Sequence, residues 1–286
     1  MALKDLLVYV DQTENSLVRL RLAVDLAVRN DSHLTALFVK ELNHDQSNLR
    51  KTAELGLVST EGLKSLNRRI EASIETTAER LQSTLSALTR GNDLVAELQC
   101  VDGVASLVVP QHARYADLCI LGQDQPEGPA SVDYTFAEHL LFVAGRPVLF
   151  VPPLGSLDTL GRHIVVAWNS SRPAARSVND ALPLIEHAER TTVLMINSSG
   201  FIDRNGPPGE HIVEHFRRHG AVTDVVLIDD VSPDSIADTL QAKAHALGAD
   251  LIVAGAFGYP RIWEKLLGGT TYDLLARMSL PIFMSH

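Results

Sequence analysis

The chain has 286 residues, 45% hydrophobic and 21% charged, which suits about two globular domains of roughly 150 residues each rather than a disordered protein. The net charge is -10, and both halves contribute to it. Up to Ser156 there are 14 basic and 20 acidic residues, and after Ser156 there are 11 basic and 15 acidic residues. Neither half therefore offers the basic surface that nucleic acids or anionic membranes require.

The amino-terminal segment MALKDLLVYVDQ contains an apolar run of only five residues before Asp11. This run is too short for the core of a signal peptide, and no run approaches the roughly 18 apolar residues of a membrane span. We therefore expect a cytoplasmic protein without a membrane partner. Cys100 and Cys119 lack the spacing of metal ligands, so we interpret both as small buried residues of strands in a reducing compartment.

The two halves of the sequence repeat one pattern. LLVYVDQTENSLVRLRLAVDLAVRNDSHLTALFV, from Leu6, matches IVVAWNSSRPAARSVNDALPLIEHAERTTVLMI, from Ile164, in the order strand, polar turn, helix and strand. Later, ADLCILGQ from Ala116 matches ADLIVAGA from Ala249, so the offset falls from 158 to 133. The first half thus holds about 25 extra residues, which we place in 43–88 as a longer connection and a long helix.

Each half is expected to alternate five strands with four helices. In the second half the strands are predicted near 163–168, 191–197, 223–228, 250–254 and 281–284. Such alternation predicts right-handed crossovers and an α/β fold. We therefore expect two tandem doubly wound, five-stranded parallel sheets with the strand order 3-2-1-4-5.

The segment PPLGSLDTLG, residues 152–161, has the composition of a linker. It divides the chain into predicted domains at 1–153 and 162–286. The last strand of each domain, VLFV and IFMS, would lie at a sheet edge, and exposed edges favour pairing. We therefore expect the two domains to form a pseudo-dimer within one chain, and the same edges would serve a homodimer.

The segment GAFGYPRIWEKLLGGTTYDLL, from Gly255, contains four glycines in its first fifteen residues. It follows the apolar strand LIVAG and precedes a helix in which Tyr272, Leu275 and Ala276 are predicted to share one stripe. Open parallel sheets bind ligands at the carboxyl ends of their strands, and helix amino ends attract anions. We expect Gly255 to allow a positive φ and close backbone approach. The segment is therefore interpreted as a phosphate-binding loop, with a tight turn that binds nothing as the alternative.

The spacing of these glycines resembles that of the universal stress proteins. Their nucleotide-binding pattern is glycine, two residues, glycine, nine residues, glycine and then serine or threonine. Gly255, Gly258 and Gly268 match it, whereas Gly269 occupies the hydroxyl position and Thr270 follows one residue later. The resemblance covers both halves and implies a tandem universal stress protein with two adenine nucleotide alpha hydrolase-like domains. It also implies a role in the stress response, with ATP and Mg²⁺ or a related adenine nucleotide as the ligand.

In that family the base and sugar lie near the ends of the first and second strands, which correspond to Asn169 and Ser198. Asparagine donates and accepts hydrogen bonds, so it can contact a nucleoside; a turn or helix-cap role is the alternative for Asn169. The nucleotide-binding residues that the resemblance implies are Asn169, Ser198, Gly255, Gly258, Gly268, Gly269 and Thr270.

The first half lacks this loop. Its counterpart, GQDQPEGPASVDYTFAEHLL from Gly122, keeps only the first glycine. Asp124, Glu127 and Asp133 add negative charge there, which would repel phosphates. We therefore expect no nucleotide in the first half, although Asp11 occupies its first-strand position.

No catalytic or metal-binding residues are predicted. The motifs of P-loop enzymes, dinucleotide folds, zinc proteases and α/β-hydrolases are absent. Glu264 and Asp273 lie near the glycines, but we interpret them as exposed helix or loop residues rather than general bases. The sequence favours a regulatory nucleotide-binding protein. A slow ATPase built on the same site, and a scaffold that binds no nucleotide, remain open.

Overall fold

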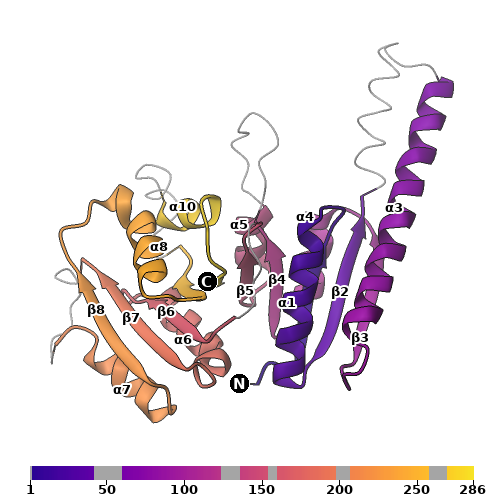
Figure 1. Cartoon of the computed structure of the whole chain (residues 1–286). Coiled ribbons are helices and arrows are strands. Elements are labelled where there is room, and N and C mark those ends of the chain that lie inside the picture. Colours follow the sequence, from indigo (N-terminus) through magenta and orange to yellow (C-terminus); the bar gives the residue numbers. More distant parts are fainter. Residues whose placement is uncertain (1, 42–59, 124–135, 154–159, 198–206, 258–268) are drawn as a thin grey trace. The chain divides into compact units, whose positions relative to one another are not determined.

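The computed structural model describes residues 2–41, 60–123, 136–153, 160–197, 207–257 and 269–286 (Figure 1). The expectations for Ser198, Gly258 and Gly268 therefore lie outside the described residues, as does most of the expected linker. The chain forms two compact units, one spanning Lys4–Cys119 and the other Met1–Leu3 with Ile120–His286.

In the unit Lys4–Cys119, three parallel strands pair in the order β3-β2-β1. The strands are β1 (Asp5–Val10), β2 (His33–Lys40) and β3 (Ala96–Asp102). The helices are α1 (Asn15–Asn30), α3 (Thr60–Leu88) and α4 (Ala105–Ala113). The 29 residues of α3 confirm that the extra length of the first half includes a long helix.

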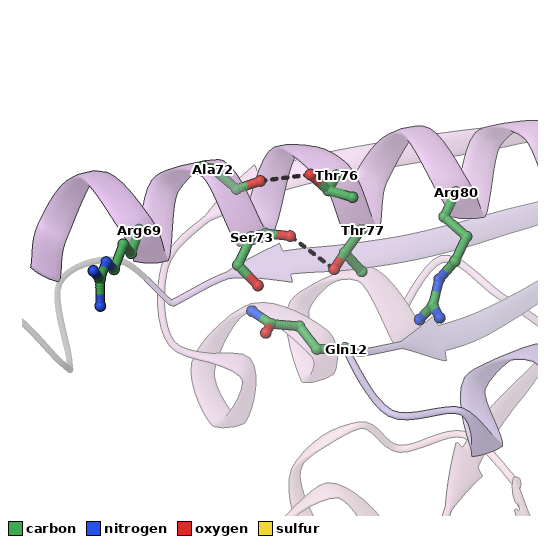
Figure 2. A pocket seen from close by; sticks show the side chains of 7 residues that line it. All are labelled: Gln12, Arg69, Ala72, Ser73, Thr76, Thr77 and Arg80. Atoms are coloured by element: carbon green, nitrogen blue, oxygen red, sulfur yellow. Dashed lines mark hydrogen bonds between the residues drawn. The ribbon is translucent and has the colours of Figure 1, made fainter.

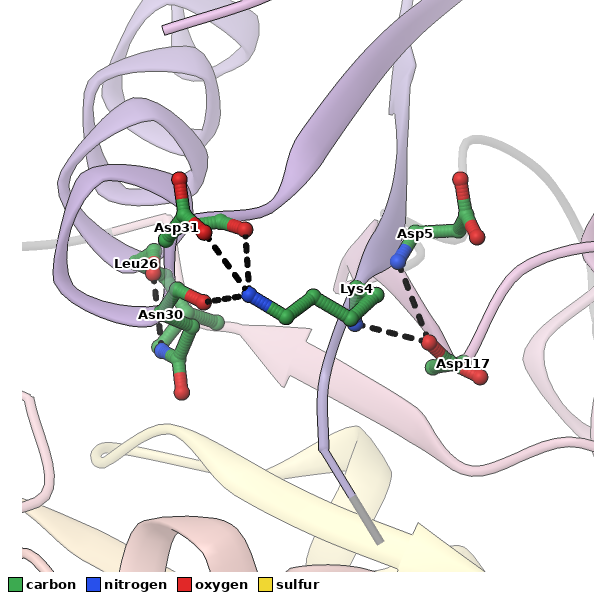
Figure 3. A network of polar contacts seen from close by, with 6 residues as sticks. All are labelled: Lys4, Asp5, Leu26, Asn30, Asp31 and Asp117. Carbon is green, nitrogen blue, oxygen red and sulfur yellow. Dashed lines mark hydrogen bonds and ion pairs between the residues drawn. The ribbon is translucent and has the colours of Figure 1, made fainter. Parts of the chain in front are cut away.

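Polar contacts fix the start of β1 (Figure 3). The Asp117 carboxylate accepts hydrogen bonds from the backbone N–H groups of Lys4 and Asp5, at 2.8 and 3.0 Å. The Lys4 ammonium donates to the carbonyl oxygens of Asn30 and Asp31, at 3.1 and 2.8 Å. A cation at these carbonyls favours the carboxyl end of α1, where helix carbonyls carry partial negative charge.

The unit Ile120–His286 contains a parallel sheet in the order β8-β7-β6-β9-β10. Its strands are β6 (His163–Ala167), β7 (Arg190–Ile196), β8 (Thr223–Ile228), β9 (Leu251–Gly255) and β10 (Ile282–Ser285). Each begins and ends within one residue of its predicted position. Numbered within the repeat, the order is 3-2-1-4-5, which confirms the expected fold class.

Four described helices connect these strands, with the 3₁₀ turn η2 (Pro233–Ser235) before the third. They are α6 (Arg172–Ile185), α7 (Glu210–Arg218), α8 (Ile236–Ala246) and α10 (Thr270–Ala276). Among the described residues, no helix is both long and apolar enough to span a membrane.

The boundary between the two units falls within β4 (Leu118–Gly122), and α5 (Phe136–Val143) and β5 (Val148–Val151) follow it in the chain. β5 pairs with β10 in antiparallel fashion, with Leu149 opposite Phe283. This pairing places β5 in the same compact unit as the second half. The domain bounds 1–153 and 162–286 follow the sequence repeat and stay predictions.

Burial along the strands follows their position in each sheet. Every residue of β4, β5 and β10 is buried, as expected for strands covered on both faces. By contrast, β3 alternates between exposed and partly buried residues. Cys119 in β4 is buried, which raises the pKa of its thiol to about 12. The prediction that Cys100 is buried is wrong, because it lies in β3 at an exposed position.

The apolar stripe predicted for α10 is also wrong. Thr271, Leu274 and Leu275 form the buried side of the helix, whereas Tyr272 is 53% exposed. Thr271 belongs to the buried side, and its hydroxyl accepts a hydrogen bond from the Phe257 N–H at 3.1 Å.

Candidate functional site

The strand registers bring the ends of three strands together at one edge of the second sheet. Ala167 of β6 lies opposite Ala254 of β9, and Gly255 lies opposite Ser285 of β10. The residues that follow β6 and β9 are therefore neighbours. In open parallel sheets this carboxyl edge is where ligands bind.

Asn169 lies in the turn that leads from β6 into α6. Its Oδ1 accepts a hydrogen bond from the Ser171 N–H at 3.1 Å, and Ser170 between them has a positive φ of 56°. Ser171 in turn caps α6 by accepting from the Ala174 N–H at 3.3 Å. The Asn169 side chain thus does shape the turn. It is also exposed, and its Nδ2 has no partner among the described residues.

Gly255 ends β9 directly against the start of α6. A Cβ atom at this position would lie 2.3 Å from the backbone nitrogen of Ala174 and 2.5 Å from the carbonyl carbon of Pro173. Only glycine allows so close an approach of two backbones. The expected positive φ at Gly255 is wrong, because its φ lies outside the left-handed region. Its backbone does approach closely, but the partner in the structure is α6.

A serine that the sequence reading missed ties the same elements together. The Ser177 hydroxyl of α6 donates to the Ala254 carbonyl oxygen at 2.6 Å and accepts from the Ser285 N–H at 2.8 Å. Ser177 is 1% exposed. This hydroxyl therefore connects α6 to the ends of both β9 and β10. The available signal was a serine on the apolar stripe of an amphipathic helix, where the sequence reading placed no function.

Phe257 and Thr271 flank the part of the glycine-rich segment that lies outside the described residues, and their hydrogen bond joins its two sides. Phe257 has a positive φ of 54°, and its ring stacks on Phe142 at a centroid distance of 4.4 Å. His286 packs edge-on against Phe142 at 4.6 Å, and its Nδ1 lies 3.1 Å from the Ala256 carbonyl oxygen. These contacts fix where the segment leaves β9.

Gly269 and Thr270 lie at the amino end of α10. Gly269 precedes the helix with φ -72° and ψ 122°, and no side chain caps it. The first N–H groups of a helix have no partner within the helix, so they are available to an anion. The structure therefore places a helix amino end where the sequence predicted one.

One candidate general base lies among the described residues. Asp273 in α10 forms an ion pair with Arg277, with Oδ1 and Nη2 3.0 Å apart. The Asp273 carboxylate is therefore already engaged within its own helix. Glu264 lies outside the described residues. In the described part of the chain, no group of three or more His, Cys, Asp or Glu side chains is placed to hold a metal ion.

The corresponding strand end of the first half is occupied by its own side chains. The Asp11 Oδ2 accepts a hydrogen bond from Arg19 Nη2 at 2.6 Å, and Oδ1 accepts from the hydroxyls of Thr13 and Ser16. Burial opposes the charge on Asp11, but Arg19 and these hydroxyls outweigh it and hold the carboxyl pKa below its ordinary value. Asp11 thus has a buried internal partner.

Comparison with known proteins identifies the fold. Neither a protein-family model nor a curated protein matches the sequence. A universal stress protein from Archaeoglobus fulgidus DSM 4304 matches with a TM-score of 0.71 at 16% identity, covering 98% of this chain and 95% of its own. This chain has the universal stress protein fold. A putative universal stress protein from Pseudomonas aeruginosa UCBPP-PA14 matches with a TM-score of 0.56 at 17% identity, covering 99% and 93%.

A functionally unknown protein from Pseudomonas aeruginosa PAO1 gives a TM-score of 0.56 at 16% identity, covering 99% of this chain and 92% of its own. The universal stress protein fold therefore extends over nearly the whole chain. This result confirms the resemblance that the glycine spacing and the internal repeat indicated.

Proposed function

We propose that this protein is a stress-response regulatory protein whose second half binds ATP or a related adenine nucleotide. The observation that carries the proposal is the meeting of three features at one sheet edge: the exposed Asn169 amide, the end of β9 at Gly255, and the amino end of α10 at Gly269. This edge offers hydrogen bonds to a nucleoside and N–H groups to phosphates.

In the proposed complex, Asn169 and the backbone at Ser198 hold the base and sugar. The backbone N–H groups of Gly268, Gly269 and Thr270 hold the phosphates, and Gly258 gives the chain room to approach them. Mg²⁺ accompanies ATP and neutralises part of its charge. Gly255 supports this site indirectly, because it lets β9 end against α6.

The first half is proposed to bind no nucleotide. Asp11, which would contact the sugar, is already held by Arg19 and two hydroxyls. A nucleoside would have to break this network or share it. The proposed stoichiometry is therefore one nucleotide per chain.

Calorimetric titration with ATP and Mg²⁺, and separately with ADP and AMP, tests the proposal. The expected result is one site per chain, weakened by Asn169→Ala and abolished by Gly268→Val. Asn179→Ala is the matched control, because Asn179 is exposed on α6 and, among the residues that the structure describes, donates only to the Ala175 carbonyl oxygen. Two equivalent sites per chain would contradict the proposed asymmetry.

The same titration separates the two alternatives. Release of phosphate from bound ATP would show a slow ATPase, which we do not favour because Asp273 is paired with Arg277. Absence of binding at millimolar ATP would favour a scaffold. In that case Asn169 and Gly255 would be explained by the turn and the backbone packing alone.

A further inference from the structure

A second candidate site lies in the unit Lys4–Cys119. A cleft of about 460 Å³ opens between α3 and the loop that follows β1. Figure 2 shows Gln12 of that loop facing α3, with Arg69 and Arg80 to either side. The side chains that line it include two guanidinium groups, one amide and three hydroxyls.

The cleft is rich in unused hydrogen-bond donors. The side chains of Gln12, Arg69 and Ser73 have no hydrogen-bond or ion-pair partner among the described residues. Arg80 uses Nη1 to bind Glu14 Oε1 at 2.6 Å. A guanidinium has five N–H donors, so most of those of Arg80 remain for a ligand.

The remaining hydroxyls are already committed as donors. Thr76 Oγ1 donates to the Ala72 carbonyl oxygen at 2.8 Å, and Thr77 Oγ1 donates to the Ser73 carbonyl oxygen at 2.9 Å. They can therefore only accept hydrogen bonds from a ligand or its water. Recognition of an anion falls to the two arginines, with Gln12 and Ser73 between them.

The charges of α3 are segregated by face. Arg69, Ser73, Thr76 and Arg80 follow the spacing i, i+4, i+7 and i+11, which places them on one side of a helix. The acidic residues of this stretch, Glu71, Glu75 and Glu79, fall on the other side. This face of α3 carries no carboxylate of its own, in a protein with net charge -10, so it offers a local site for an anion in spite of Glu14 beside Arg80.

The distance between the arginines suggests the shape of that anion. Eleven residues of α-helix span about 16 Å at a rise of about 1.5 Å per residue. Even with both side chains leaning inward, one small anion would satisfy only one guanidinium well. A longer ligand with several charged groups would contact both, and arginine is well suited to phosphate oxygens.

We propose that the cleft between Gln12 and α3 binds a linear chain of phosphate groups, held at its two ends by Arg69 and Arg80. Glu14 competes with this ligand for Arg80, because its carboxylate occupies one guanidinium nitrogen in the structure. The ligand is an inorganic phosphate chain, because the first half is proposed to bind no nucleotide.

Calorimetric titration of the full chain with tripolyphosphate at low ionic strength tests the proposal. Arg69→Gln and Arg80→Gln should each weaken binding about fivefold or more, because each removes charge-assisted hydrogen bonds. Glu14→Gln should strengthen binding, because it frees Arg80. Strengthening cannot result from misfolding, so this variant keeps the test valid if another loses stability.

Arg68→Gln is the matched control. Arg68 is exposed on the same helix, donates from Nε to the Lys64 carbonyl oxygen, and does not line the cleft. Its replacement changes the net charge by the same amount and should leave the affinity unchanged. A loss equal to that of Arg69→Gln would overturn the proposal, because it would show diffuse attraction to any arginine on α3.

Titrations with orthophosphate and ATP distinguish the ligand sources and separate this cleft from the proposed nucleotide site. Orthophosphate should bind more weakly than tripolyphosphate, since it cannot reach both arginines. ATP should bind through Asn169 and not through Arg69, so an ATP site that is lost in Arg69→Gln and kept in Asn169→Ala would overturn the assignment of an inorganic ligand. Failure of tripolyphosphate to bind at millimolar concentration, or its loss in Asn169→Ala but not in Arg69→Gln, would overturn the proposal.

Discussion

The first helix of each half carries a different buried polar residue at the same position of the repeat. In α1 this residue is Arg19, which is 4% exposed and pairs with Asp11 at the end of β1. In α6 it is Ser177, 158 residues later, which bonds to the backbone ends of β9 and β10. One strand end thus encloses a charged pair, whereas the other is closed by neutral hydrogen bonds.

The residues that follow the first strand of each half differ in the same way. Asp11 binds Arg19 within its own half. Asn169 is exposed, and its Nδ2 has no hydrogen-bond partner among the described residues. The repeat therefore preserves the backbone but not the chemistry at the carboxyl ends of its first strands. A function assigned to one half does not transfer to the other.

The largest effect is expected from Gly255→Ala, which tests whether α6 needs the close approach of β9. The new Cβ would lie within 2.8 Å of three backbone atoms of Pro173 and Ala174, which cannot rotate away. We expect a loss of about 3 kcal/mol in the free energy of unfolding, as for severe overpacking. Chemical denaturation measures it.

Gly103→Ala is the control for that change. Its Cβ would meet one side-chain atom, Val108 Cγ2, at 2.6 Å, and Val108 can adopt another rotamer. We expect a smaller loss, about 1 kcal/mol. If both variants were equally stable, the glycine at 255 would be needed for a ligand rather than for packing.

Arg19→Met tests the closed strand end of the first half. It would leave the partly buried Asp11 carboxylate without its guanidinium, which costs about 2 to 3 kcal/mol for a pair that is not fully buried. The double variant Asp11→Asn/Arg19→Met should recover part of the loss, because it removes the unpaired charge. Additive losses in the double-mutant cycle would show that the two side chains do not depend on each other.

The sequence predicted the strands of the second half to within one residue, because each is a short apolar run next to a turn. It also predicted a helix from about Gly268, two residues before α10 begins, and gave a turn as one of two roles for Asn169. It missed the contacts of Arg19 and Ser177, since periodicity shows that a helix position is buried but not what the position contacts. The stripe of α10 failed because two helical turns contain too few residues to define a face.

Ser177→Ala tests the neutral strand end of the second half. It would leave the buried Ser285 N–H without its acceptor and remove a donor from the Ala254 carbonyl oxygen. An unsatisfied buried group costs about 1 to 3 kcal/mol, so we expect a loss of about 2 kcal/mol in stability. Ser83→Ala, at an exposed position of α3, is the control and should change stability by less than about 0.5 kcal/mol.

The smallest and most specific effect is the pH dependence of the free energy of unfolding. The folded-state pKa of Asp11 lies below its ordinary value, because Arg19 and nearby hydroxyls outweigh the opposing effect of burial. The unfolded chain therefore binds a proton more readily than the folded one, so this pair stabilises the protein at neutral pH and loses its contribution as the pH falls below about 5. Asparagine does not titrate, so Asn169 gives the second half no such dependence.

Denaturant unfolding between pH 6 and pH 3 should show a shallower loss of stability for Asp11→Asn than for the parent. The variant starts from a lower stability, because Arg19 is left unpaired. Asp25→Asn, which removes an exposed carboxylate from α1, is the control for the change in net charge. Equal slopes in all three proteins would mean that the buried pair does not distinguish the two strand ends in solution.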